Sequence, residues 1–260
     1  MPRAFLFEFE DLPWFPQVIR EGMMDYLRHM IEWTHFYEPC ARVIADCLTQ
    51  TKSNKITELC AGGGGGVLTM IDHLAALNCR PQITLTDLYP NHSRWEALRN
   101  KSTQIDFAAE PVNALYVSPE VKGLRIMFSA IHHFRPAQVK SMLTDAVTHR
   151  EPIAIFDAGT TSPLAIPAVI LLEPITFVLL TPFFRPFRWS RLFFTYVIPL
   201  IILCTIWDGC VSILRFYTKR ELEQTVHELQ HNKYIWKVGT LKNRLGIPIH
   251  FVTGIPADAN

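Results

Sequence analysis

Five consecutive glycines, Gly62–Gly66, follow a short apolar run that ends near Glu58. Glycine has no Cβ, so the backbone amides of such a turn can approach an anion or a carboxylate without obstruction. The pattern predicts a strand over Lys55–Leu59 and a helix over Val67–Leu77. A glycine-rich turn between a strand and a helix is typical of nucleotide-binding Rossmann-like sheets. The run therefore predicts a nucleotide site rather than a merely flexible loop.

A second acid follows at the distance expected for such a site. Asp87 closes the next predicted strand, Gln82–Thr86, 23 residues after Gly64. An acid at this point can accept both ribose hydroxyls with its two oxygens, although a turn or helix-capping aspartate is the alternative. Leu88 and Tyr89 could then pack on the base. The dinucleotide fingerprint would need a third glycine at position 67, which is valine, so NAD is disfavoured.

Two adjacent histidines follow a further predicted strand, Gly123–Ser129. Open α/β sheets bind ligands at the carboxyl edge of the strands, so Ser129, His132 and His133 are expected beside the ligand. An imidazole there could take a proton from a hydroxyl nucleophile at neutral pH, whereas a structural role for at least one histidine is the alternative. Asp157, at the end of the strand predicted over Pro152–Phe156, is a candidate for positioning or for a structural role.

The elements that must position these residues alternate between strands and helices, which predicts an α/β fold with a parallel sheet. Helices are predicted within residues 14–50, over Ser93–Asn100, Pro136–Thr148 and Thr218–Gln230, the last opening with a Thr-Lys-Arg-Glu capping box. Tyr234–Thr240 and Ile247–Gly254 alternate as two strands joined by a polar loop. They predict a C-terminal antiparallel hairpin.

Composition excludes several classes of function. The 25 basic residues nearly balance the 24 acidic ones, so a large nucleic-acid-binding surface is not expected. The six cysteines form no CxxC pair, so we expect neither a metal site nor a disulfide framework, and a reducing cytosolic setting is the plain interpretation. The first residues lack the charged start and the apolar run of a signal peptide.

The order of Glu58, the glycines and Asp87 resembles the motif of class I S-adenosylmethionine-dependent methyltransferases. The resemblance implies that Glu58 faces the methionine ammonium and that Asn113 accepts a bond from the adenine amino group, where the related pattern often has aspartate. An ordinary turn residue is the alternative for Asn113. The cofactor residues that the resemblance and the spacing together imply are Glu58, Cys60, Ala61, Gly62, Gly64, Asp87, Leu88, Asn113 and Ser129.

An apolar segment over residues 162–207 interrupts this pattern. Its only charges are Glu173 and the trio Arg185, Arg188 and Arg191, and prolines 167, 174, 182 and 199 would kink its helices. We weigh three interpretations: a hairpin embedded in one leaflet with its arginines at headgroup level, a soluble lid, and a true double span. The first is favoured because a double span would carry three arginines across the bilayer.

Two further candidates for catalysis follow this segment. Asp208 and Tyr217 could orient a substrate hydroxyl or carboxylate, whereas an Asp208–Arg215 pair anchoring the insert is the alternative. Motifs such as LTDLYPN, HHFRPAQ and WDGCVSILRFYT resemble a bacterial group of class I methyltransferase-like proteins with an apolar insert. The resemblance implies no particular substrate, so the cofactor is better supported than the reaction.

The sequence thus predicts three regions. These are an N-terminal helical lid over 1–50, a Rossmann-like methyltransferase domain over 51–161 and 208–260, and an apolar helical insert over 162–207. We expect an S-adenosylmethionine-dependent enzyme, most simply an O-methyltransferase, that acts on a hydrophobic small molecule or lipid at the cytoplasmic side of a membrane. A soluble lid would make it cytoplasmic. A non-methylating enzyme that binds the same cofactor, or a degenerate membrane-bound scaffold, remains open, as does the oligomeric state.

Overall fold

The computed structural model describes residues 3, 6–229 and 233–258, and they form two compact units. Unit 1 joins Met1–Trp33 to Thr160–Phe216, and unit 2 joins Thr34–Gly159 to Tyr217–Asn260. This division differs from the predicted one, because the described residues up to Trp33 pack with the apolar segment and residues 34–50 belong with the sheet. The chain therefore crosses between the units three times.

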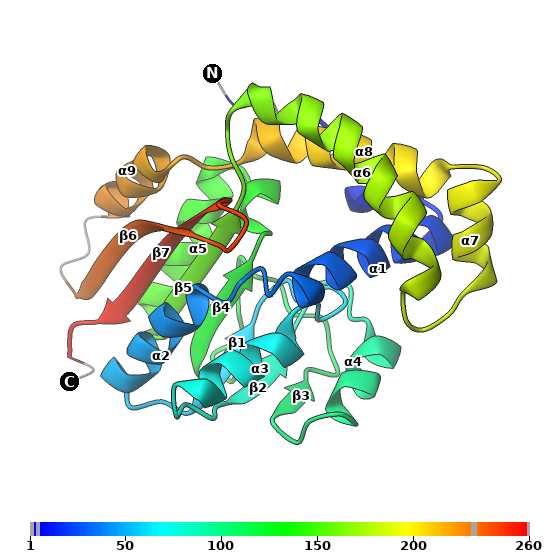
Figure 1. Ribbon diagram of the computed structural model, residues 1–260. Helices are drawn as coiled ribbons and strands as arrows, with labels where there is room; N and C mark the ends of the chain where they lie inside the picture. The colour runs from blue at the N-terminus through cyan, green and yellow to red at the C-terminus, as the bar shows by residue number, and fades with distance from the viewer. Residues whose placement is uncertain (1–2, 4–5, 230–232, 259–260) are drawn as a thin grey trace. The chain divides into compact units, whose positions relative to one another are not determined.

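Unit 2 is built on one seven-stranded sheet in the order β3-β2-β1-β4-β5-β7-β6 (Figure 1). The strands β1 to β5 are parallel, and β7 runs antiparallel to both β5 and β6. The predicted α/β sheet and the predicted C-terminal hairpin are therefore confirmed. The strands are β1 (Lys55–Glu58), β2 (Gln82–Leu85), β3 (Ile105–Phe107), β4 (Leu124–Phe128), β5 (Ile153–Ala158), β6 (Tyr234–Lys242) and β7 (Pro248–Pro256).

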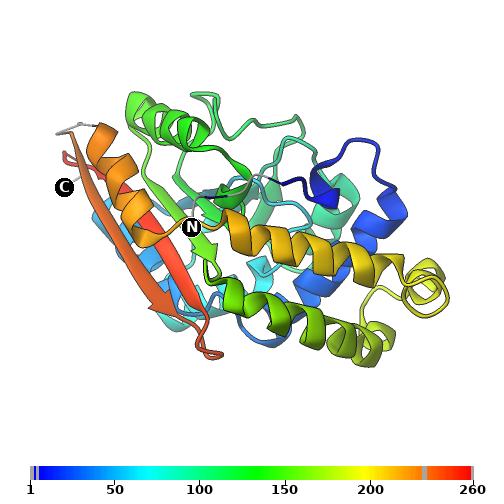
Figure 2. The same cartoon turned by 90° about the horizontal axis from the view of Figure 1, so that it is seen from above.

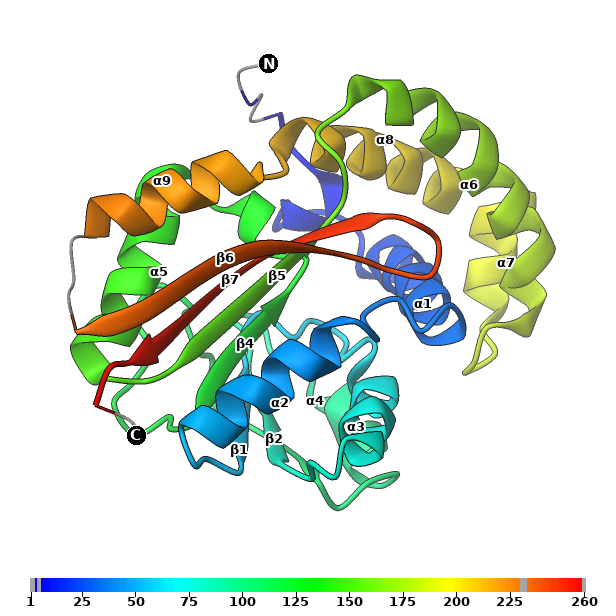
Figure 3. The same cartoon turned by 60° about the vertical axis from the view of Figure 1, so that its left-hand side comes forward.

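Helices cover both faces of this sheet, and Figure 3 shows α2 and α3 on one face with α5 and α9 on the other. Apolar residues of α5, including Val139 and Leu143, pack with Met127 of β4 and Leu222 of α9 in a continuous core. The predicted capping box of α9 is present, since Thr218 and Glu221 exchange hydrogen bonds. The helices are α2 (Cys40–Gln50), α3 (Val67–Ala76), α4 (His92–Arg99), α5 (Pro136–His149) and α9 (Lys219–Leu229).

Unit 1 is helical, and Figure 2 shows α6 lying beside α8. Its core joins α1 to the apolar segment, with Tyr26 stacked on Phe177 at 3.8 Å between ring centroids. A side chain at Gly22 would collide with Ile201, so α1 and α8 approach closely there. The helices are η1 (Phe9–Asp11), α1 (Gln17–Trp33), η3 (Pro163–Ala165), α6 (Ile166–Leu180), η4 (Thr181–Phe183), α7 (Trp189–Tyr196) and α8 (Leu200–Arg215).

The arginines of the apolar segment correct one expectation. Arg191 is buried rather than at a surface, and its guanidinium lies 2.5 Å from Oδ2 of Asp25 on α1. It also donates to the carbonyl oxygens of Phe184 and Pro186. Arg188 forms an ion pair with Glu21, which also lies on α1. Two of the three arginines thus pair with acids of α1, and for the buried Arg191 this partner is required because an unpaired buried charge is costly.

By length and composition, Pro163–Phe183 is one helical stretch that could cross a membrane. The pair α7 and α8 meets the same criterion together but is bent by 74°. Residues of Pro163–Phe183 are mostly exposed, as are Phe193, Val197 and Leu203 of the bent pair. Unit 1 therefore carries an exposed apolar surface.

Candidate active site

Glu58 ends β1 at the carboxyl edge of the sheet, and its side chain is buried. Burial raises the pKa of this carboxyl to about 8, with no charge or hydrogen bond among the described residues contributing. Removal from water disfavours the charged form of an acid. Glu58 is therefore mostly protonated at neutral pH, and a cation brought beside it would restore the carboxylate.

The turn after β1 is held in a conformation that glycine makes possible. Cys60, Gly62, Gly64 and Gly66 all have positive φ angles. A Cβ on Gly64 would lie 2.5 Å from Leu98, so this position cannot carry a side chain without a shift. By contrast, a Cβ on Gly63 would meet no atom within 4 Å. The fold thus requires glycine at 64, whereas at 63 it leaves open space beside the backbone.

Two residues outside the turn fix its backbone. The indole nitrogen of Trp95, a fully buried residue of α4, donates to the carbonyl oxygen of Gly62 at 2.9 Å. The amide of Ala61 donates to the carbonyl oxygen of Thr86 at the end of β2. Sequence reasoning missed Trp95, because a tryptophan in an amphipathic helix carries no local sign that it bonds a turn 33 residues earlier.

Asp87 lies directly beside the glycine turn. Its Oδ2 accepts from the amide of Gly62 at 2.8 Å, and its Oδ1 accepts from the amide of Tyr89 at 2.9 Å. Each carboxylate oxygen can accept a second bond, so the side chain is oriented and can still take two hydroxyl groups. Leu88 and Tyr89 are exposed next to it. The predicted juxtaposition of turn and acid is therefore present.

The loop that carries Asn113 also reaches this edge, because the amide of Val112 donates to the carbonyl oxygen of Asp87 at 2.8 Å. Asn113 itself is exposed, and its Oδ1 accepts from the amide of Leu115. The oxygen thus orders its own turn, as the alternative interpretation expected. It retains a second lone pair for a ligand.

Ser129 follows β4 with a φ angle of 41°, a left-handed conformation that serine seldom adopts. Its Oγ accepts from the hydroxyl of Tyr37 at 2.6 Å and from the amide of Ala158 at 3.3 Å. Tyr37 is buried, packs against Phe128, and has its pKa raised by burial. The sequence does not predict this bond, since nothing local links positions 37 and 129.

The two histidines lie in the short helix η2 (Ile131–His133), and the structure distinguishes them. Nδ1 of the buried His132 lies 2.8 Å from Oδ1 of Asp157 on β5. A carboxylate accepts hydrogen bonds, so this contact is satisfied when Nδ1 of His132 carries a proton. Oδ2 of Asp157 is buried and has no partner among the described residues. His133 is less buried, with its ring 4.4 Å from that of His132.

The other two residues predicted for catalysis use their polar groups within the fold. Asp208 belongs to unit 1, where it accepts from the amides of Phe9 and Glu10, and burial raises its pKa to about 7. Tyr217 belongs to unit 2, is fully buried, and donates to the carbonyl oxygen of Phe134. Arg215 forms its ion pairs with the N-terminal acids rather than with Asp208.

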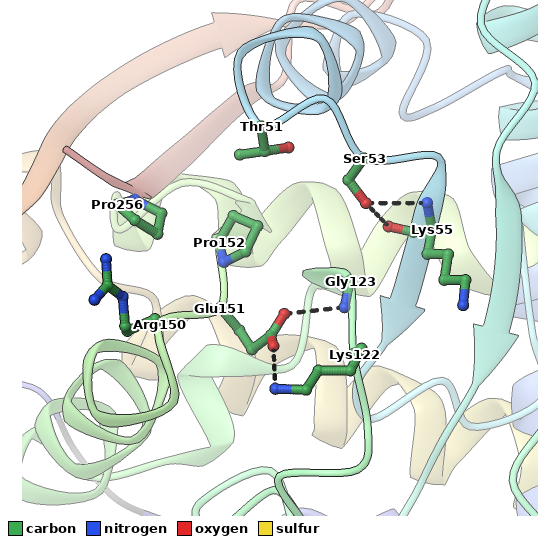
Figure 4. A pocket seen from close by; sticks show the side chains of 9 residues that line it. All are labelled: Thr51, Ser53, Lys55, Lys122, Gly123, Arg150, Glu151, Pro152 and Pro256. Carbon is green, nitrogen blue, oxygen red and sulfur yellow. Dashed lines mark hydrogen bonds and ion pairs between the residues drawn. The ribbon is translucent and has the colours of Figure 1, made fainter. Parts of the chain in front are cut away.

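A cavity of about 290 Å³ opens at the opposite edge of the sheet, where the strands begin (Figure 4). Glu151 lies among its lining residues, pairs with Lys122 at 2.8 Å, and accepts from the amide of Gly123 at 3.0 Å. Because these groups satisfy one another and lie at the amino ends of the strands, the cavity is not the predicted ligand site.

No model of a known protein family and no curated protein sequence matches the chain. Solved structures do match. The plantazolicin methyltransferase BpumL in complex with SAH has a TM-score of 0.58 and 11% identity, covering 95% of this chain and 94% of its own. The O-methyltransferase NcsB1 from neocarzinostatin biosynthesis, in complex with S-adenosylmethionine and a naphthoic acid, has a TM-score of 0.52 and 10% identity, with coverage of 92% and 58%.

A third similar structure is that of the S-adenosylmethionine-dependent methyltransferase SibL in its apo form. It has a TM-score of 0.52 and 11% identity, and the match covers 97% of this chain and 63% of that chain. At such identities the likeness concerns the fold. The chain has the fold of the class I S-adenosylmethionine-dependent methyltransferases.

Proposed function

We propose that the protein is an S-adenosylmethionine-dependent methyltransferase that methylates an oxygen atom of a hydrophobic small molecule or lipid. The observation that carries the proposal is the arrangement of Glu58, the glycine turn and Asp87 at the carboxyl edge of a sheet with the methyltransferase fold. The similar structures support it, because BpumL and NcsB1 are methyltransferases crystallised with the product or the substrate form of this cofactor.

The residues present fit the cofactor. The buried Glu58 would become a carboxylate beside the ammonium group, Asp87 would accept the ribose hydroxyls, and the open space at Gly63 would admit the amino-acid end. Cys60, Ala61, Gly62 and Gly64 would form the turn around it, with Leu88 beside the adenine, Asn113 bonded to its amino group and Ser129 nearer the methyl.

The bound cofactor would supply an electrophilic methyl group on a sulfonium. We assign His132 as the base, with its ring held by the contact of Nδ1 with Asp157. The acceptor oxygen would form its new bond to the methyl carbon as the carbon–sulfur bond breaks, and the electron pair of that bond would stay on sulfur. The hydroxyl proton would pass to Nε2. The main contribution of the chain is alignment of these groups.

Asp87→Ala tests the cofactor site directly. Titration calorimetry with S-adenosylhomocysteine should give micromolar binding to the wild type and about hundredfold weaker binding to the variant, because two hydrogen bonds to a charged group are lost. Asp106→Ala is the matched control, because this exposed aspartate on β3 should leave the affinity unchanged. Wild-type protein that binds neither form of the cofactor would instead favour a degenerate scaffold.

The mass of the product shows whether the enzyme transfers a methyl group. Incubation with S-adenosylmethionine carrying a labelled methyl group and an organic extract of the source cells should yield a product heavier by one methylene unit. His132→Ala should lose this product while still binding S-adenosylhomocysteine. A product of unchanged mass would show a non-methylating reaction with the same cofactor, and a water-soluble labelled product would contradict the substrate class.

A further inference from the structure

The outward side of α6 and its flanking turns carries a continuous apolar stripe. Leu171, Ile175 and Leu179 recur at the spacing of one helical face, and the exposed fractions of Leu171 and Leu179 are 66% and 62%. No member of this stripe has a side-chain hydrogen-bond donor or acceptor. We call it the α6 stripe, and it consists of Leu164, Ala168, Leu171, Ile175, Val178, Leu179 and Pro182.

The inward side of α6 is different. Phe177 is fully buried against Tyr26, and the hydroxyl of Thr176 lies 2.7 Å from that of Tyr26. Glu173, the one charged residue of the helix, points at α8, where its Oε1 lies 3.1 Å from the place a Cβ on Gly209 would occupy. Burial raises the pKa of Glu173 to about 8. The polar side chains of α6 therefore face the interior of unit 1, and only apolar side chains face outward.

The packing of unit 1 argues against a hairpin that spans a bilayer. A span would need hydrocarbon around both arms, yet α7 and α8 pack against α1. The 17 residues of α1 include five charged ones, Arg20, Glu21, Asp25, Arg28 and Glu32, and burial of such a helix in lipid is very costly. The bend of 74° between α7 and α8 also prevents one straight crossing.

The end of α6 carries residues that favour a membrane–water boundary. Phe183, Phe187 and Trp189 are exposed around the turn that leads into α7. Arg185 is exposed there too, and among the described residues its guanidinium forms no ion pair. Aromatic rings and arginine beside an apolar surface are the combination found at the headgroup level of bilayers.

We propose that the α6 stripe and the exposed aromatic residues beside it dock unit 1 into one leaflet of a lipid bilayer. A protein partner would be expected to meet hydrogen-bonding groups, since protein interfaces have about one hydrogen bond per 100–200 Å² and the stripe offers none from its side chains. A one-sided apolar surface with a cationic, aromatic end matches a leaflet instead. Docking would give the enzyme access to substrates dissolved in the membrane, a consequence that rests on the proposed function.

Flotation with vesicles tests the docking without cofactor or substrate. Full-length protein mixed with phosphatidylcholine vesicles in the absence of detergent should rise with them through a density gradient. Leu171→Gln/Leu179→Gln should lower the partition coefficient at least tenfold, because two leucine side chains lose favourable transfer to hydrocarbon. Leu245→Gln is the matched control: this leucine of unit 2 is 59% exposed outside the stripe, and binding should not change.

One control separates this inference from the proposed function. The double variant and Leu245→Gln should keep the circular dichroism spectrum and the melting temperature of the wild type, which shows that they are folded whether or not the protein binds the cofactor. Wild-type protein that stays below the vesicles, or a double variant that floats equally well, would overturn the docking. A vesicle-free dimer that the double variant splits into monomers would assign the stripe to a second copy of the chain and would also overturn it.

Discussion

Two buried acids of unit 1, Asp25 and Asp208, differ from two of unit 2, Glu58 and Asp157, in how much of their bonding capacity the fold uses. In unit 1 the buried Asp25 is paired with Arg191, and Asp208 accepts from two backbone amides. In unit 2, burial alone raises the pKa of Glu58. Oδ2 of Asp157 is also buried, and it accepts no hydrogen bond from any described residue. Buried polar groups cost free energy unless they are bonded, so the bonds of Asp25 and Asp208 serve the fold. Glu58 and Asp157 keep bonding capacity that the fold does not use.

The units also differ in what they expose. Unit 1 leaves the α6 stripe in solvent, whereas the sheet of unit 2 is covered by helices on both faces. Large contiguous apolar surfaces are uncommon on soluble proteins and mark sites of interaction. We therefore expect the polar chemistry in unit 2 and the apolar contact in unit 1.

The largest effect is expected from Asp25→Ala in unit 1. Arg191 would then be buried without its carboxylate, which typically costs about 3–5 kcal/mol of folding free energy. Urea unfolding followed by tryptophan fluorescence should show the loss, and Asp25→Leu combined with Arg191→Met should recover much of it. Asp46→Ala, on the exposed side of α2, is the control with a change below about 0.5 kcal/mol. A stable Asp25→Ala protein would contradict a purely structural role for the acids of unit 1.

Glu58 should make cofactor binding depend on pH. Its pKa of about 8 in the free protein must fall when an ammonium group pairs with it, so binding releases a proton below pH 8. Affinity for S-adenosylhomocysteine should rise about tenfold per pH unit up to about pH 8 and then level, as one pKa unit is about 1.4 kcal/mol. Calorimetry in buffers of different ionisation enthalpy would measure the number of protons that binding releases.

The matched variant is Glu58→Gln, which should bind S-adenosylhomocysteine weakly and with an affinity that does not rise with pH.

The raised pKa of Glu58 also affects the stability of the folded protein. The folded protein holds the Glu58 proton up to about pH 8 while the unfolded chain releases it near the ordinary value of 4.5, so this contribution to stability falls as pH rises between the two. Glu58→Gln should remove that decline. Equal pH slopes in both proteins would show that another group binds the ammonium.

A smaller effect is expected from Gly63→Ala. The new Cβ meets no protein atom within 4 Å, so the melting temperature should hold or rise slightly. Affinity for S-adenosylhomocysteine should fall about tenfold, because the methyl group would occupy the space proposed for the ligand. Gly64→Ala is the contrasting variant, with a strained φ angle of 67° and a clash with Leu98, and it should lose stability instead. Unaltered binding by Gly63→Ala would place the cofactor elsewhere on the turn.

Much of unit 2 could be predicted from the sequence because its signals are local. A strand, five glycines and a helix are contiguous, and the strand–helix alternation gave element bounds within a few residues of those observed. Glu58 and Asp87 fall at the ends of neighbouring parallel strands, β1 and β2, whose carboxyl ends meet at one edge of the sheet. The α/β fold and the glycine turn beside Asp87 therefore followed from the sequence.

Other features depend on contacts between distant residues. The bonds of Tyr37 to Ser129, of His132 to Asp157 and of Asp25 to Arg191 join positions 92, 25 and 166 residues apart. The grouping of α1 with the apolar segment, and hence the pairing of Arg188 and Arg191, also arises only when the helices pack. The sequence by itself determined which groups were available for chemistry. The tertiary structure decided which of them have their bonding capacity used, because burial and partner geometry are properties of packed elements rather than of residue order.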